Sequence, residues 1–89
     1  MAQAAAEEGL RVAARQAGLS ANWREWNQQA GILDGPGRFA LYTLKALAFI
    51  HLRRSERPHA LAILDALRKL DPRGEVGWPV VAALAEGTA

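Results

Sequence analysis

Few side chains in this 89-residue sequence are suited to chemistry, and their spacing does not assemble a catalytic site. His51 and His59 lie eight positions apart across a helix turn, with no cysteine and no carboxylates at ligand spacing, so they make a poor metal site. We expect His51 to be a core or groove residue and His59 to be exposed. The two serines, Ser20 and Ser55, fall at predicted turns, where capping explains them better than nucleophilic catalysis.

The remaining candidates are a glycine pair and a tryptophan pair. Gly35 and Gly37 flank a proline without the lysine and the preceding strand of a phosphate-binding loop. Trp23 and Trp26 are three residues apart, a spacing that suits either an aromatic platform or, more simply, packing against a core. We therefore predict no enzymatic activity, no cofactor and no metal.

Composition points to an ordered protein of modest size. Hydrophobic residues make up 51% of the chain, and the absence of cysteine excludes disulfides and cysteine-based zinc sites. The N-terminal stretch MAQAAAEEGL is acidic where a secretion signal is basic, and Lys45 interrupts the best apolar run before it is long enough to span a bilayer. We expect a cytoplasmic protein with no membrane span.

The net charge of +2 is too small to indicate nucleic-acid binding, although the cations are concentrated in one region. A helical hairpin formed by this region would have a basic surface that is able to contact phosphates. The alternative is a solvated surface with cations near helix C-termini, where they complement the helix dipole. The cations of this region are Lys45, Arg53, Arg54, Arg57, Arg68, Lys69 and Arg73.

Strand signals are absent, and the pattern predicts an all-α fold of about five helices. Gly18 suits the end of the first helix, Ser20 the cap of the second, and Pro58 the first turn of the fourth. We expect a single domain, 1–89, made of an N-terminal helical pair (1–33), a helix hairpin (38–72) and a C-terminal helix (75–86). The predicted helices cover 4–17, 21–30, 38–54, 58–70 and 76–86.

Residues 41–74 fit one register of a helical repeat without a gap. Ala48 and Ala60 occupy the positions of the repeat that require a small residue, and the segment ends with Leu70-Asp71-Pro72. Trp78 and Ala82 then start a second repeat in phase. This pattern resembles the tetratricopeptide repeat, in which antiparallel helix pairs stack and bind another protein. The resemblance implies one full repeat followed by a half repeat, with Ser55 departing from the usual turn glycine.

The helix predicted over 38–54 has almost no polar face, so it is either buried on all sides or leaves one face for a partner. In the repeat register, one set of residues packs inside the hairpin: Leu44, Leu47, Leu61 and Leu64. The face that lines the concave groove, and hence the predicted partner-binding site, consists of Tyr42, Lys45, Phe49, Leu52 and Arg53, extended by Val76, Val80 and Ala83.

The stretch PHALAILDALRKLDPRGEVGWPVVAAL, residues 58–84, resembles the small tetratricopeptide chaperones of bacterial type III secretion systems. This resemblance implies a non-enzymatic cytosolic chaperone that holds an apolar helix or extended segment of a secretion-apparatus partner. The partner would be a small helical or secreted subunit, or a second copy of the chain. The competing hypothesis is a basic helical nucleic-acid-binding domain that uses Arg53, Arg54, Arg57 and Arg68.

Overall fold

Four α-helices and one 3-10 turn form the computed structural model, which describes residues 2–29 and 31–87. The elements are α1 (Ala2–Gln16), η1 (Trp23–Glu25), α2 (Gly35–Arg53), α3 (Arg57–Leu70) and α4 (Trp78–Gly87). Within these ranges there is no strand, which confirms the all-α prediction. None of the described helices is both long and apolar enough to cross a membrane.

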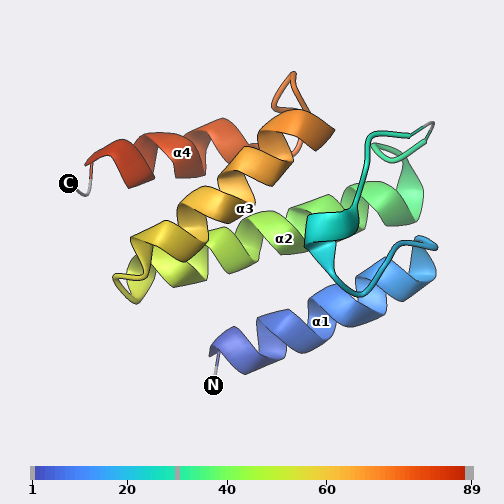
Figure 1. Cartoon of the computed structure of the whole chain (residues 1–89), viewed down its shortest axis with the longest axis horizontal. Helices are drawn as coiled ribbons and strands as arrows, with labels where there is room; N and C mark the ends of the chain where they lie inside the picture. Colours follow the sequence, from blue (N-terminus) through green and yellow to red (C-terminus); the bar gives the residue numbers. More distant parts are fainter. Residues whose placement is uncertain (1, 30, 88–89) are drawn as a thin grey trace.

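Helix α2 runs through the middle of the fold, with α1 on one side, α4 on the other and α3 crossing over it (Figure 1). Consecutive helices run in opposite directions, so α2 and α4 run in the same direction (Figure 1). Ala13 and Ala14 are fully buried on α1, and their small side chains let α1 approach α2 closely. The core then fills with larger side chains from the central helices, among them Leu41, Leu44 and Ile63.

Glycine ends α1 as the sequence predicted. Gly18 has a φ of +70°, a left-handed conformation that glycine adopts without steric cost. Its N–H donates to Arg15 O at 3.1 Å, and Leu19 N–H donates to Ala14 O at 2.8 Å. These bonds satisfy the carbonyls of Ala14 and Arg15 in the last turn of α1, after which the chain turns toward η1.

The helix predicted over 21–30 is wrong: only η1 forms there, and Ala30 lies outside the described residues. Asn22 caps this turn by accepting a hydrogen bond from Arg24 N–H at 3.1 Å. Trp26 then turns to extended backbone, is 7% exposed, and donates its indole N–H to Ser20 O at 2.6 Å. Most of the other residues of this segment are polar, so a helix would bury little, whereas the extended chain places Trp26 in the core.

Helix α2 begins at Gly35, three residues before the predicted start. Pro36 occupies the first turn, where its missing N–H is not needed. Gly37 has to be a glycine because a Cβ at this position would collide with Ile32 O. Phe39, which the predicted helix also contained, lies four residues after the observed start of α2.

The turn between α2 and α3 has a left-handed residue at the glycine position of the repeat pattern. Ser55 has a φ of +60°, and the next N–H, that of Glu56, reaches back to His51 O at 2.8 Å. Helix α3 then starts at Arg57, within one residue of the prediction, with Pro58 in its first turn.

Asp71 organises the connection from α3 to α4. Its carboxylate is fully buried and accepts hydrogen bonds from Glu75 N–H and Val76 N–H, both at 2.9 Å. Its carbonyl accepts one from the Trp78 indole N–H at 2.7 Å. These bonds hold Val76 in a loop, so α4 begins at Trp78 rather than at the predicted Val76, and Pro79 falls in its first turn.

Candidate partner-binding surface

Helix α2 has one buried and one exposed face, although both are apolar. Leu41, Leu44 and Ala48 are fully buried on the inner face. On the opposite side Phe39 is 57% exposed and Tyr42 39% exposed, and Phe49 continues the same stripe. The interpretation in which this helix is buried on all sides therefore does not hold for the chain on its own.

Three cations flank the exposed aromatic rings of α2. The Lys45 ammonium lies 4.9 Å from the centroid of the Tyr42 ring, and the Arg38 guanidinium lies 5.6 Å from the same ring. The Arg53 guanidinium lies 5.8 Å from the centroid of Phe49. Cations over ring faces are attracted by the ring quadrupole, which helps to hold both groups at the surface.

Helix α4 packs against α2 and carries exposed aliphatic side chains of its own. It also packs against α3, and Gly77, the residue before α4, lies beside Lys45, because a Cβ on Gly77 would be 3.3 Å from the Lys45 Nζ. Val80 is 69% exposed, and Ala83 and Leu84 are also exposed. We call the exposed apolar residues of the two helices the α2–α4 face: Phe39, Tyr42, Phe49, Val80, Ala83 and Leu84.

Five of the eight predicted site residues are exposed, Lys45 and Leu52 are half-buried, and Val76 is buried. Leu52 is half-buried and packs against the core. Val76 is 1% exposed, and the Asp71 carboxylate binds its N–H, so it is unavailable to a partner. The other six lie on the α2–α4 face or flank its rings: Tyr42, Lys45, Phe49, Arg53, Val80 and Ala83.

The predicted hairpin core is correct except at one position. Leu44, Leu47 and Leu64 are at most 3% exposed. Leu61 is 39% exposed, so its assignment to the core is wrong. The buried stripe of α3 instead runs through Ala60, Ile63, Leu64, Leu67 and Leu70, and Leu61 falls beside this stripe on the helix surface.

Sequence reasoning missed three residues of this surface: Arg38, Phe39 and Leu84. Phe39 precedes Tyr42 by three residues and Leu84 follows Val80 by four, so helical spacing alone would have found both. Arg38 donates to Glu75 O at 3.2 Å and pairs with its carboxylate at 3.5 Å, a contact across 37 residues that no local pattern reveals.

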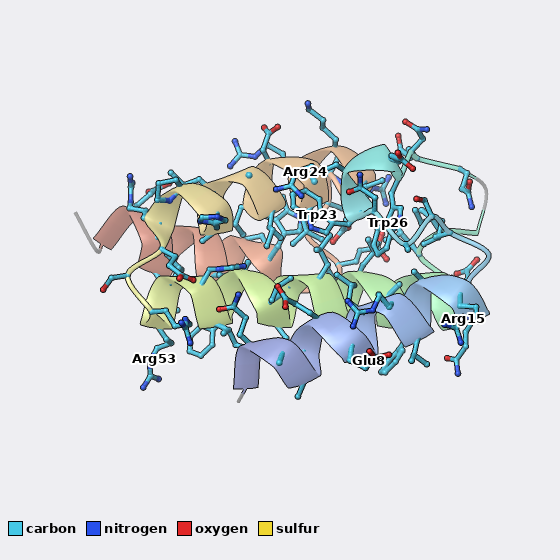
Figure 2. All side chains as sticks on the ribbon, turned by 60° about the horizontal axis from the view of Figure 1, so that its bottom comes forward. Glu8, Arg15, Trp23, Arg24, Trp26 and Arg53 are labelled. Atoms are coloured by element: carbon cyan, nitrogen blue, oxygen red, sulfur yellow. The ribbon has the colours of Figure 1, made fainter. Side chains whose placement is uncertain are left out.

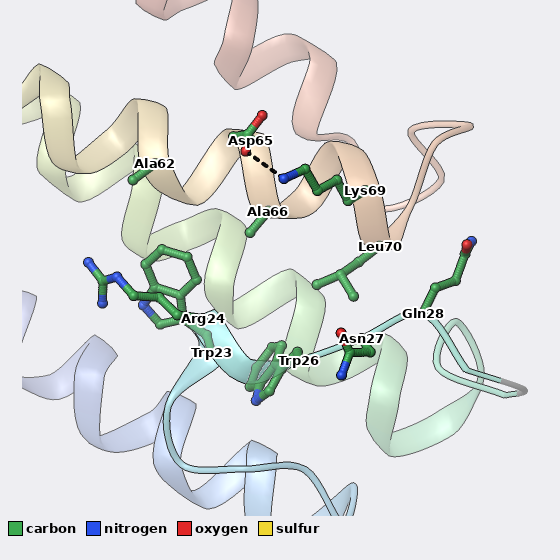
Figure 3. Close-up of a pocket in the computed structure, with 10 residues that line it drawn as sticks. All are labelled: Trp23, Arg24, Trp26, Asn27, Gln28, Ala62, Asp65, Ala66, Lys69 and Leu70. Carbon is green, nitrogen blue, oxygen red and sulfur yellow. Dashed lines mark ion pairs between the residues drawn. The ribbon is translucent and has the colours of Figure 1, made fainter.

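A separate hollow of about 390 Å³ lies between η1 and α3 (Figure 3). Trp23 and Trp26 line it, with Ala62 and Ala66 on the α3 side. The Arg24 guanidinium covers the Trp23 ring at 4.3 Å. Figure 2 shows Trp23, Arg24 and Trp26 beside α3, well away from Arg53 at the end of α2. Trp26 is a core residue, and Trp23 packs against the core while one side of it borders the hollow.

The two histidines stack on each other at the start of α3. Their ring centroids are 5.1 Å apart, and His51 Nδ1 lies 2.8 Å from Glu56 Oε1. The hydrogen bond with His51, aided by the charge of Arg54, lowers the pKa of Glu56. His51 is buried and His59 is exposed, as predicted. In the described ranges no three His, Cys, Asp or Glu side chains gather as a metal site requires.

Most of the cations proposed for nucleic-acid binding have partners within the chain. Arg54 lies 3.6 Å from the Glu56 carboxylate, and Arg57 donates to Ala85 O at 3.2 Å. Arg68 covers the Trp78 ring at 5.3 Å. Arg68 lies near the opposite end of α3 from Arg57, so these arginines do not all gather at the turn between α2 and α3.

Comparison of the chain with protein families, with curated proteins and with solved structures finds no match.

Proposed function

We propose that this protein is a non-catalytic protein-binding module, a cytoplasmic chaperone that holds an apolar helix or extended segment of a secretion-apparatus partner on the α2–α4 face. The observation that carries the proposal is the exposed aromatic stripe of α2, with Phe39 more than half exposed. Fully burying an apolar side chain stabilises by about 1.5–3 kcal/mol, so a partner that covered the 57% of Phe39 still exposed would gain about half of that. Exposed apolar patches of this kind mark binding sites.

The arrangement of the helices supports a tetratricopeptide type of repeat. On this proposal α2 and α3 form the full repeat, and α4 is the first helix of the next one. The antiparallel α2–α3 pair closes on the Asp71 loop, and Trp78 opens α4 with its indole bonded to Asp71 O. Val80 is 69% exposed and Leu84 46% exposed on α4, so this half repeat offers an apolar surface for association.

We also propose that the chain does not exist as an isolated monomer, but dimerises or pairs with a second small helical protein. Light scattering would then give a mass above that of one chain, or the free chain would bind a hydrophobic dye. A monomer that binds no dye would contradict the proposal, because it would show that the α2–α4 face does not behave as an open apolar surface.

Co-purification from the native host, followed by mass spectrometry, tests the function. The wild-type chain should retain a stoichiometric protein partner or a second copy of itself. Phe49→Ala should weaken that association by about 2 kcal/mol or more, as the loss of a central aromatic anchor does. Retention of the partner at full strength by Phe49→Ala would contradict the placement of the site.

The nucleic-acid alternative has less support, because most of its cations are engaged within the chain, as with Arg57 on Ala85 O. A salt titration of binding to random-sequence duplex separates the two hypotheses. Phosphate contacts release counterions, so measurable affinity that falls steeply with salt would favour nucleic acid.

A further inference from the structure

We infer that the segment bound on the α2–α4 face is an amphipathic helix of about four turns whose apolar stripe is bordered by Asp and Glu. This inference rests on the proposed function, because it assumes that the α2–α4 face is the partner-binding surface. It adds the conformation, length and charge of the bound segment.

The charge of the partner follows from the cations that flank the rings. Arg38 already has a carboxylate, that of Glu75, at 3.5 Å. Among the described residues no ion pair engages Lys45 or Arg53. The border of the aromatic stripe is therefore left with uncompensated positive charge. A partner with Asp or Glu beside its apolar residues would complement this charge, whereas Lys or Arg there would be repelled.

Other carboxylates lie away from the stripe. Glu86 lines a hollow with Leu61, Asp65 and Arg68, on the side of α4 that faces α3. Glu56 is bonded to His51 at the turn after α2. Neither offers a counter-charge to Lys45 or Arg53, so the complementing groups have to come from the partner.

The length and conformation follow from the geometry of α2. The stripe runs from Phe39 to Arg53, fourteen residues apart, and a helix rises about 1.5 Å per residue, so it is about 21 Å long. Phe39, Tyr42 and Phe49 are spaced by three and seven residues, so their rings form a single row. A partner helix of about 15 residues, apolar at every third or fourth position, matches such a row along its whole length.

The same surface fits nucleic acid less well. The Lys45 ammonium lies over the ring of Tyr42 and the Arg53 guanidinium over that of Phe49, so these rings are partly covered against base stacking. Val80 and Leu84 offer aliphatic side chains, which do not stack on bases. A few cations would also neutralise only a few phosphates.

Binding of two labelled 15-residue peptides to the full chain tests the inference by fluorescence anisotropy. Both peptides are amphipathic helices with the same leucine stripe, one bordered by Glu and the other by Lys. The wild-type chain should bind the Glu-bordered peptide at least about tenfold more tightly at low salt, with the ratio shrinking as salt rises. The double variant Lys45→Glu/Arg53→Glu should reverse this preference. A matched variant, Arg15→Glu/Lys69→Glu, changes the net charge by the same amount through residues on α1 and α3. It should keep the preference for the Glu-bordered peptide.

The possible results of the peptide-binding experiment have different consequences for the inference and for the proposed function. Equal binding of both peptides that is lost in Phe49→Ala would overturn the acidic border while leaving the proposed function standing. Failure of both peptides to bind would overturn the inference, and co-purification would then judge the function separately. Displacement of the Glu-bordered peptide by a 15-nucleotide oligouridine, with a steep salt dependence, would assign the surface to nucleic acid. If the double variant does not fold by circular dichroism, the single change Arg53→Glu at the exposed end of α2 should still abolish the preference for Glu.

Discussion

Replacing Asp71 with alanine should destabilise this protein more than any surface change. The carboxylate is fully buried and accepts two backbone hydrogen bonds at 2.9 Å, from Glu75 and Val76. Hydrogen bonds to a charged group contribute about 1.5–3 kcal/mol each, and alanine would leave both donors without this acceptor. We therefore expect a loss of about 3–6 kcal/mol, a large part of the roughly 5–13 kcal/mol available to a domain of this length.

Thermal and urea unfolding, followed by circular dichroism, measure this effect. A loss of 3 kcal/mol corresponds to a fall in Tm of about 12 °C or more in so small a domain. Asp71→Asn should lie between wild type and alanine, since an amide keeps one acceptor oxygen. Asp65→Ala is the control: Asp65 is exposed and pairs with Lys69 at 3.3 Å, a contact that contributes about 0.5 kcal/mol or less. If Asp71→Ala were as stable as this control, the carboxylate would not be what holds the start of α4.

Three further predictions concern stability. Leu64→Ala should cost about 2–5 kcal/mol in chemical unfolding, whereas Leu61→Ala on the exposed side of α3 should cost about 1 kcal/mol or less. Ser55→Gly should add about 1 kcal/mol, because glycine adopts the φ of +60° without strain; an unchanged midpoint would show that the turn is not strained. Because its hydrogen bond with His51 lowers the pKa of Glu56, ionised Glu56 stabilises the fold above pH 4.5, and this contribution is lost as the pH falls through the folded pKa. Glu56→Gln should therefore flatten the acid side of the stability profile, and an unchanged acid limb would contradict the role of this pair.

Local sequence signals predict the helix ends that lie at a glycine or a proline. Gly18 closes α1 and Pro58 opens α3 close to where the sequence placed them. These residues act through their own backbone conformation, so no knowledge of distant contacts is needed. The start of α4 was missed because Asp71, five residues before Val76, takes the N–H groups that would have opened the helix.

The second predicted helix failed for a tertiary reason. Trp23 and Trp26 have helical spacing, but the indole of Trp26 bonds Ser20 O and its side chain enters the core from extended backbone. The gain from burying a tryptophan outweighs the helix preference of the residues around it, such as Arg24, Glu25 and Gln28. Spacing alone does not show which of these two effects is larger.

The candidate site was predicted better on α2 than beyond it. Tyr42 and Phe49 share a face by helical periodicity, and the structure leaves both exposed. Val76 was placed on the same surface only because α4 was extended backward by two residues, and in the loop it is buried. Errors at helix ends thus become errors in the site, since one residue turns a side chain by about 100°.

The central claim is that the exposed stripe of α2 binds another protein chain and is not part of the core. Phe49→Glu and Leu61→Glu form the most direct comparison, because Phe49 is 38% exposed and Leu61 39% exposed, on α2 and α3 respectively. Both variants should unfold within a few degrees of wild type, and only Phe49→Glu should lose the co-purified partner or the self-dimer. The account would be contradicted if Phe49→Glu unfolded the isolated chain, or if it retained the partner as well as Leu61→Glu does.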